Sequence, residues 1–137
     1  MLKKTMTYVD FNGETVVEDL YFNLNALEYT RLTARNGGDL DKRIANLVAK
    51  DDTEAIIALM EDLLLSSYGV KSEDGRRFVK TKQVREDFEY SQAYAELFVL
   101  LLTNPEETKK FGQGIASSAQ AQQSAQAQQF VPTLEEV

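Results

Sequence analysis

Several residue types are missing from this sequence, and each absence narrows the chemistry available to the protein. There is no cysteine, which excludes disulfides and thiolate nucleophiles. There is no histidine, the commonest general base and metal ligand, and no tryptophan. The longest purely apolar run, 97–102, is far too short to span a membrane, and the N-terminus lacks the apolar core of a signal peptide. We therefore expect a cytoplasmic protein with no membrane partner.

The composition is otherwise that of an ordinary globular domain. Of the 137 residues, 43% are hydrophobic and 27% are charged, and this length suits one domain with a core that needs no metal or disulfide. The formal net charge is -7. Because an acidic protein is repelled by phosphate backbones, nucleic acid is not expected as a partner.

The N-terminal segment predicts a β-hairpin over about 5–22. Two runs rich in β-forming residues, 5–11 and 14–22, flank Asn12-Gly13. This dipeptide favours a two-residue type I′ turn. A lone hairpin is marginally stable, so it either covers the helices or offers a strand-pairing surface.

Helical periodicity and capping residues predict five to six short helices after the hairpin. We expect them over 26–35, 40–50, 53 to 67 or 68, 82–89 and 92–102, with a further one starting at Pro105. Gly37-Gly38 and Gly69 are expected to end the first and third helices. The predicted N-caps are Asn25, Asp39, Asp52 or Thr53, Thr81 and Ser91.

The helix over 92–102 is apolar nearly all round, interrupted only by Gln92 and Glu96. Such a helix must be covered on most sides. Either it is the central core helix, or part of it is covered by another protein chain. The sequence leaves both possibilities open.

The segment 72–78, Ser-Glu-Asp-Gly-Arg-Arg-Phe, predicts a turn that returns Phe78 to the core and points Arg76 or Arg77 outward. Arg76 and Arg77 belong to a locally basic zone over 71–85. These cations either neutralise nearby acids and helix ends, or form an Arg-bearing contact site, or bind nucleic acid. The overall charge disfavours the last of these.

The C-terminal part changes composition sharply. Residues 116–129 contain only Ala, Ser and Gln, and the chain then continues as Phe-Val-Pro-Thr-Leu-Glu-Glu-Val over 130–137. We therefore divide the chain into a helical domain over 1–115 and a flexible low-complexity tail over 116–137. The apolar and acidic residues of 130–137 form either a docking motif or a disordered end.

No set of residues points to catalysis. Acidic pairs such as Glu61-Asp62 fall at helix starts or on solvent faces, where they cap helices and aid solubility. Glu107-Thr108-Lys109 matches a nuclease-like triplet but has no matching upstream carboxylate on a strand. No calcium loop or phosphate-binding loop is present. We predict no catalytic residue, metal or cofactor.

A resemblance to a known family extends over about residues 5–115. The run 68–78, Tyr-Gly-Val-Lys-Ser-Glu-Asp-Gly-Arg-Arg-Phe, resembles the central signature of the tail assembly chaperones of long-tailed phages and prophages of Gram-positive hosts. Phe88 with the run 91–98, Ser-Gln-Ala-Tyr-Ala-Glu-Leu-Phe, and then 103–106 and 111–115 are similar to its later motifs. Members often end or frameshift after the last motif, whereas this chain continues into the Gln/Ala/Ser tail.

The resemblance implies a non-enzymatic protein that binds and solubilises the tape measure protein, helps the tail tube polymerise and is then released. It would act in the host cytoplasm, with the tail tube protein as a second partner, and be absent from the mature virion. We expect an apolar groove between the helices 53–67 and 92–102 to bind the tape measure helix. The alternatives are a small dimeric regulator or adaptor, or a small carboxylate enzyme. The candidate partner-binding residues are Arg76, Arg77, Phe78, Tyr94, Phe98 and Leu101.

Overall fold

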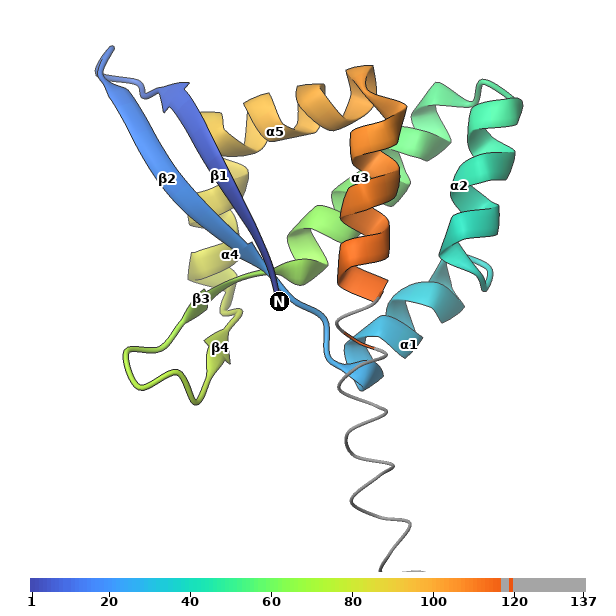
Figure 1. Ribbon diagram of the computed structural model, residues 1–137, viewed down its shortest axis with the longest axis horizontal. Helices are drawn as coiled ribbons and strands as arrows, with labels where there is room; N and C mark the ends of the chain where they lie inside the picture. The colour runs from blue at the N-terminus through green and yellow to red at the C-terminus, as the bar shows by residue number, and fades with distance from the viewer. Residues whose placement is uncertain (117–118, 120–137) are drawn as a thin grey trace, which may run out of the picture.

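The computed structural model describes residues 1–116 and 119. Its elements are, in chain order, β1 Leu2–Val9, β2 Thr15–Phe22, α1 Ala26–Arg35, α2 Leu40–Ala49, α3 Thr53–Ser67, β3 Tyr68–Lys71, β4 Phe78–Val79, α4 Lys82–Glu89 and α5 Gln92–Thr103. A further helical segment covers 105–116. In Figure 1 this segment lies between the β1–β2 hairpin with α5 on one side and α1 with α2 on the other. The prediction of a mainly helical fold with an N-terminal hairpin is confirmed. The predicted flexible tail lies outside the described residues, apart from the helical positions 116 and 119.

The hairpin is longer than predicted, and its turn is of another kind. β1 pairs with β2 from Leu2↔Phe22 to Val9↔Thr15, so the hairpin begins at Leu2. The connection is a loop in which the backbone N–H groups of Asn12 and Glu14 both donate to the Asp10 carboxylate, each at 2.9 Å. A type I′ turn needs positive φ at both central residues, and Gly13 has it but Asn12 does not. The type I′ prediction is therefore wrong, because the Asp10 side chain closes a wider loop.

Helix starts follow the predicted caps. The Asn25 side chain accepts from the Glu28 N–H, while the Glu28 carboxylate accepts from the Asn25 N–H, so α1 starts with the expected capping box. At α2, α3, α4 and α5 the cap is a single hydrogen bond, in which the side chain of Asp39, Asp52, Thr81 or Ser91 accepts from the N–H three residues later. The Gly38 N–H donates to the Thr33 carbonyl at the end of α1, with Gly37 and Gly38 both at positive φ.

A second hairpin, β3–β4, was not predicted. β3 pairs with the end of β2 at Tyr21↔Gly69 and with β4 at Lys71↔Phe78, giving a four-stranded sheet in the order β1-β2-β3-β4. α3 runs directly into β3, so Gly69 is a strand residue and the prediction that it ends the helix is wrong. Its role is steric: a Cβ at Gly69 would lie 2.6 Å from Cε2 of Phe78, so the missing side chain makes room for that ring.

The core joins the inner face of the sheet to the helices through Phe22. This ring is fully buried and makes edge-to-face contacts with Tyr68, Phe88 and Phe111, at centroid distances of 5.8, 5.8 and 4.9 Å. β2, β3, α4 and the segment 105–116 are thereby held together around one aromatic ring.

The apolar helix α5 has one face in the core and another that is exposed. α5 buries Ala93, Leu97 and Leu101, but it leaves Val99 59% exposed. α3 buries more of its length, through Leu59, Met60, Leu63, Leu64 and Ser67. Both possibilities left open for 92–102 therefore stand, since one face of α5 lies in the core and another carries exposed apolar side chains. The exposed apolar side of α5 remains available to a partner.

Candidate functional site

A mainly apolar groove of about 290 Å³ lies between α2, α3, the end of α5 and the start of the segment 105–116. We call it the apolar groove. Apart from Asp51 on its rim and the two threonines, every residue that lines it is apolar. They are Ile44, Leu47, Val48, Asp51, Thr53, Ile56, Leu59, Met60, Leu63, Leu101, Leu102, Pro105 and Thr108.

A tight connection between α2 and α3 forms one wall of this groove. Asp51 has a positive φ of 54° and reverses the chain. The Asp52 N–H then donates to the Leu47 carbonyl at 3.1 Å, and the Asp52 carboxylate caps α3. The helix faces that carry Leu47 and Leu59 are thereby turned toward each other, and both side chains are buried. The wall is fixed by backbone geometry as well as by apolar packing.

The groove has a buried floor and an exposed rim. Leu101, on the floor, is 3% exposed, whereas Val48 on α2 and Leu102 on α5 are 50% and 36% exposed at the rim. An apolar cavity of 150 Å³ accommodates a benzene ring, so a groove of this size has room for about two large side chains of a partner. Burying one such side chain contributes about 1.5–3 kcal/mol.

The three predicted site residues on α5 fall in two places. Leu101 lines the apolar groove. Tyr94 and Phe98 are half-buried and belong to a row of rings, in which Phe88 contacts Tyr94 at 5.1 Å and Tyr94 contacts Phe98 at 5.5 Å. Burial, with Glu61 and Glu89 nearby, raises the pKa of Tyr94 to about 12, so its hydroxyl is neutral at physiological pH. Tyr94 thereby joins α5 to α4, and neither Tyr94 nor Phe98 lines the groove.

The other three predicted residues lie on the β3–β4 hairpin. Its turn is held by polar contacts: the Ser72 hydroxyl donates to the Asp74 carboxylate, which also accepts the Arg76 N–H, and the Arg77 N–H donates to the Ser72 hydroxyl. The side chains of Arg76 and Arg77 are exposed, as predicted. Phe78 is half-buried against Gly69 and stays outside the main core cluster.

The basic zone divides into structural and exposed cations. Lys80 is structural, because its ammonium donates to the Asn23 carbonyl, the Glu28 carboxylate and the Ser66 carbonyl at 2.6, 2.8 and 2.9 Å. Burial lowers the pKa of Lys80, and the Glu28 carboxylate opposes that shift. For this residue, the interpretation that the cation neutralises an acid and a helix end is correct.

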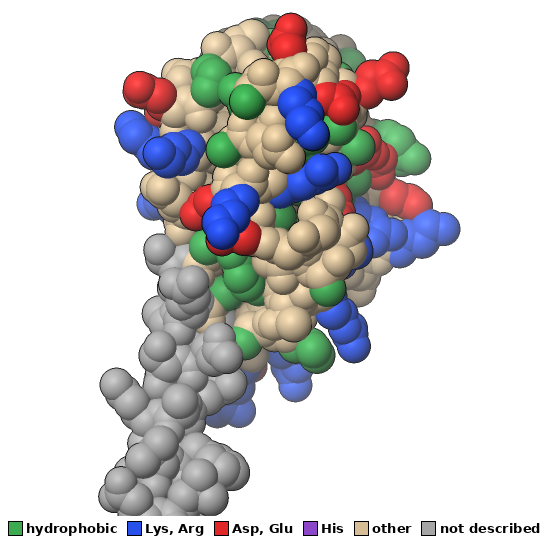
Figure 2. Space-filling view, turned by 90° about the vertical axis from the view of Figure 1, so that its right-hand side faces the viewer, with side chains coloured by type: hydrophobic (Ala, Val, Ile, Leu, Met, Phe, Trp, Pro, Cys, Tyr) green, Lys and Arg blue, Asp and Glu red, His purple; other side chains and the backbone are tan. Residues whose placement is uncertain are grey.

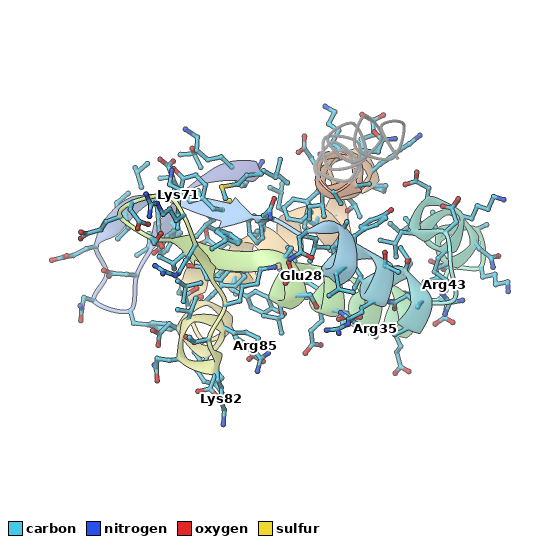
Figure 3. All side chains as sticks on the ribbon, turned by 90° about the horizontal axis from the view of Figure 1, so that it is seen from below. Glu28, Arg35, Arg43, Lys71, Lys82 and Arg85 are labelled. Carbon is cyan, nitrogen blue, oxygen red and sulfur yellow. The ribbon has the colours of Figure 1, made fainter. Side chains whose placement is uncertain are left out.

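Beside Lys80 lies a second concavity of about 260 Å³, which we call the basic pocket. It is lined by Leu24, Glu28, Arg31, Arg35, Leu65, Ser66, Tyr68, Lys80 and Arg85. Figure 3 shows Arg35 on α1 and Arg85 on α4 on the same side of the molecule, with Glu28 between them. Residues 31 and 35 were not among the predicted site residues, since an exposed arginine on a helix carries no signal of its neighbours.

The contribution of α2 to the apolar groove was not predicted. The stripe of Ile44, Leu47 and Val48 is visible as helical periodicity, but periodicity does not say which helices a stripe faces. Figure 2 shows the side of the molecule that carries α2, where cations and anions are interspersed with apolar side chains. This face presents both signs of charge to a partner.

A family model described as phage tail assembly chaperone matches residues 1–137, the whole chain. The chain belongs to this family of phage tail assembly chaperones. The resemblance noted in the sequence is thereby confirmed at the level of the family, and the protein has a role in phage tail assembly. No curated protein and no solved structure matches the chain.

Two further properties of this tail assembly chaperone bear on its site. Among the described residues, no group of three or more Asp or Glu side chains is placed to hold a metal ion. Within the same residues, no helix is both long and apolar enough to cross a membrane. The partners that the family implies are proteins of the tail assembly.

Proposed function

We propose that this tail assembly chaperone binds the tape measure protein through the apolar groove, keeps it soluble in the host cytoplasm and helps the tail tube to polymerise around it. The chaperone is then released and is absent from the mature virion. Proteins of its kind are expected in long-tailed phages of Gram-positive hosts. One observation carries the proposal: Val48 and Leu102 are exposed above a buried apolar floor made by three helices.

The shape and chemistry of the groove suit a helical partner. A tape measure protein, as the family resemblance describes it, is a long apolar helix that aggregates alone. Such a helix binds in a groove through side chains at positions i, i+3 or i+4, and i+7. The groove offers apolar contacts from α2, α3 and α5 together, so a helix can fill it with about two side chains while its other face stays outside.

The β3–β4 hairpin supplies a second, polar contact in this proposal. Arg76 and Arg77 are exposed and are held on a turn fixed by Ser72 and Asp74. Arginine is enriched at interface hot spots, because its planar guanidinium binds carboxylates in pairs of hydrogen bonds. Tyr94 and Phe98 act indirectly in this proposal, because the contact of Tyr94 with Phe88 holds α5 against α4, and Leu101 forms part of the groove floor.

Co-expression with a tape measure fragment tests the proposal. Val48→Asp and Leu102→Asp place a carboxylate on the groove rim, where the chaperone alone tolerates it because both side chains already reach solvent. Leu27→Asp is the matched control, since Leu27 is a helical leucine that is 59% exposed and lies outside the groove. Leu101→Asp is a poor test, because a charge at a position only 3% exposed would unfold the domain.

We expect the wild type and Leu27→Asp to keep the fragment soluble, and both rim variants to lose it to the pellet while remaining folded by circular dichroism. Equal solubilisation by all four proteins would contradict the proposal. The alternative function, a small dimeric adaptor, predicts a different result. In that case the rim variants would convert a dimer to a monomer in size-exclusion chromatography, with no effect on the fragment.

A further inference from the structure

Two of the four cations that line the basic pocket have no anionic partner among the described residues. Lys80 is paired with Glu28 at 2.8 Å. Arg35 forms two hydrogen bonds with Asp62, at 2.7 and 2.6 Å, so its charge is also neutralised. Arg31 on α1 and Arg85 on α4 remain, and neither guanidinium group makes an ion pair or hydrogen bond with another described residue. The pocket therefore offers two exposed guanidinium groups, one from α1 and one from α4.

An apolar surface lies next to these two guanidinium groups. Leu24, Leu65 and Tyr68 line the same pocket; Leu24 is buried and the other two are half-buried. Arginine recognises carboxylates in a bidentate manner, and leucine and tyrosine side chains provide area for apolar contact. A ligand that fits this pocket therefore carries two carboxylates next to large apolar side chains.

One segment of the chain itself has this composition. Residues 130–137, Phe-Val-Pro-Thr-Leu-Glu-Glu-Val, join two adjacent glutamates to a leucine and a phenylalanine, and they lie outside the described residues. We propose that this C-terminal segment docks in the basic pocket of its own chain, with Glu135 and Glu136 on Arg31 and Arg85, and Leu134 against Leu65 and Tyr68. Its two carboxylates match the two unpaired cations in number and sign. The apolar groove is a less suitable place, because its rim carries Asp51.

The chain is long enough to reach. A path through neighbouring residues leads from the end of the helical segment to the pocket. The Leu2 side chain lies against Gly114, and Leu2 pairs with Phe22. Leu24, two residues after Phe22, lines the pocket. Strand spacing and rise place Gly114 about 20 Å from the pocket by this path, and the helical segment to Ala116 adds about 3 Å. The ten residues 120–129 contain only Gln, Ala and Ser and can extend to about 33 Å. This length exceeds the required span.

Paramagnetic NMR on the full chain tests the docking. The sequence has no cysteine, so Gln129→Cys gives a single site for a nitroxide label next to the segment. We expect selective loss of amide signals around Arg31, Leu65 and Arg85. The loss should disappear in Arg31→Ala/Arg85→Ala, in Glu135→Gln/Glu136→Gln and in high salt. The control Lys42→Ala/Arg43→Ala removes two exposed cations from α2 and should leave the loss unchanged.

Three results would overturn the proposal. One is the absence of any selective signal loss, and another is a loss centred on Val48 and Leu102, which would place the segment in the apolar groove. The third comes from mixing spin-labelled unenriched chains with unlabelled ¹⁵N-enriched chains. A loss that also appears in this mixture would show that the segment binds a second copy. No tape measure protein is present in these samples, so their outcome is separate from the test of the proposed function.

Discussion

Lys80 and Glu28 form an ion pair that joins the helices to the strands. The Nζ atom of Lys80 lies 2.8 Å from Oε2 of Glu28, and the same ammonium donates to the carbonyls of Asn23 and Ser66. Glu28 also belongs to the capping box at the start of α1, while Ser66 is in the last turn of α3. The Lys80 side chain, which follows β4, therefore contacts the residue directly after β2, the start of α1 and the end of α3.

Lys80→Met should lower the free energy of unfolding by about 2 kcal/mol, which is a fall of roughly 5–10 °C in Tm for a domain of this size. The Asn23 carbonyl, the Glu28 carboxylate and the Ser66 carbonyl would lose their donor. Burial of the Lys80 ammonium, which lowers its pKa, reduces the stability that the ion pair contributes. Lys82→Met is the control, because Lys82 is exposed and its Glu86 partner is 3.7 Å away; it should cost less than about 0.5 kcal/mol. Equal effects of the two substitutions in thermal unfolding would contradict this prediction.

Asp62→Asn should cost stability at neutral pH but not in acid. Burial by itself would raise the pKa of Asp62, but hydrogen bonds from Arg35, Asn36 and Ser66 outweigh it, so the pKa lies below its ordinary value of 3.8. The contribution is thus fully present above pH 3.8 and is lost as the pH falls through the lowered pKa. We expect a cost of about 1 kcal/mol at pH 7 in urea unfolding, since the pair is partly exposed. A difference between wild type and variant that stayed constant down to pH 2.5 would argue against this account.

Gly69→Ala should destabilise the protein by about 1–3 kcal/mol, because the new Cβ would overlap the Phe78 ring at 2.6 Å. Gly112→Ala is the matched control. The nearest atom to its Cβ, Cδ1 of Ile44, is 3.9 Å away, and alanine in a helix is favoured over glycine by about 0.5–1 kcal/mol. Adding Phe78→Ala should remove most of the cost of Gly69→Ala, so a double-mutant cycle should show strong coupling between the two substitutions. Additive costs would show that the glycine is needed for another reason.

Local features of the fold were predictable from the sequence. Helix starts depend on one side chain bonding a backbone N–H three residues later, so Asn25, Asp39 and Ser91 identified them correctly. The end of α1 was equally local, since the adjacent glycines there accept positive φ. The family was also recognisable, because its motifs lie within continuous stretches of the chain.

Features that depend on contacts distant in sequence were not predictable. The β3–β4 hairpin has a two-residue strand that gains its partner only because Tyr68 and Gly69 pair with β2. Gly69 looked like a helix end, since nothing local says that Phe78 will lie across it. The walls of the apolar groove that come from α3 and α5 were predicted. The wall from α2 was not, because it depends on the chain reversal at Asp51.

Site-specific crosslinking is the most direct test of the claim that the apolar groove binds the tape measure protein. Because the chain has no cysteine, Leu102→Cys, Val48→Cys and the control Leu27→Cys each provide one attachment site for a photoreactive maleimide. After purified, labelled chaperone is mixed with a solubilised tape measure fragment, we predict crosslinks to the fragment from positions 48 and 102 and none from position 27. Equal crosslinking from all three positions, or crosslinks only between copies of the chaperone, would contradict the account.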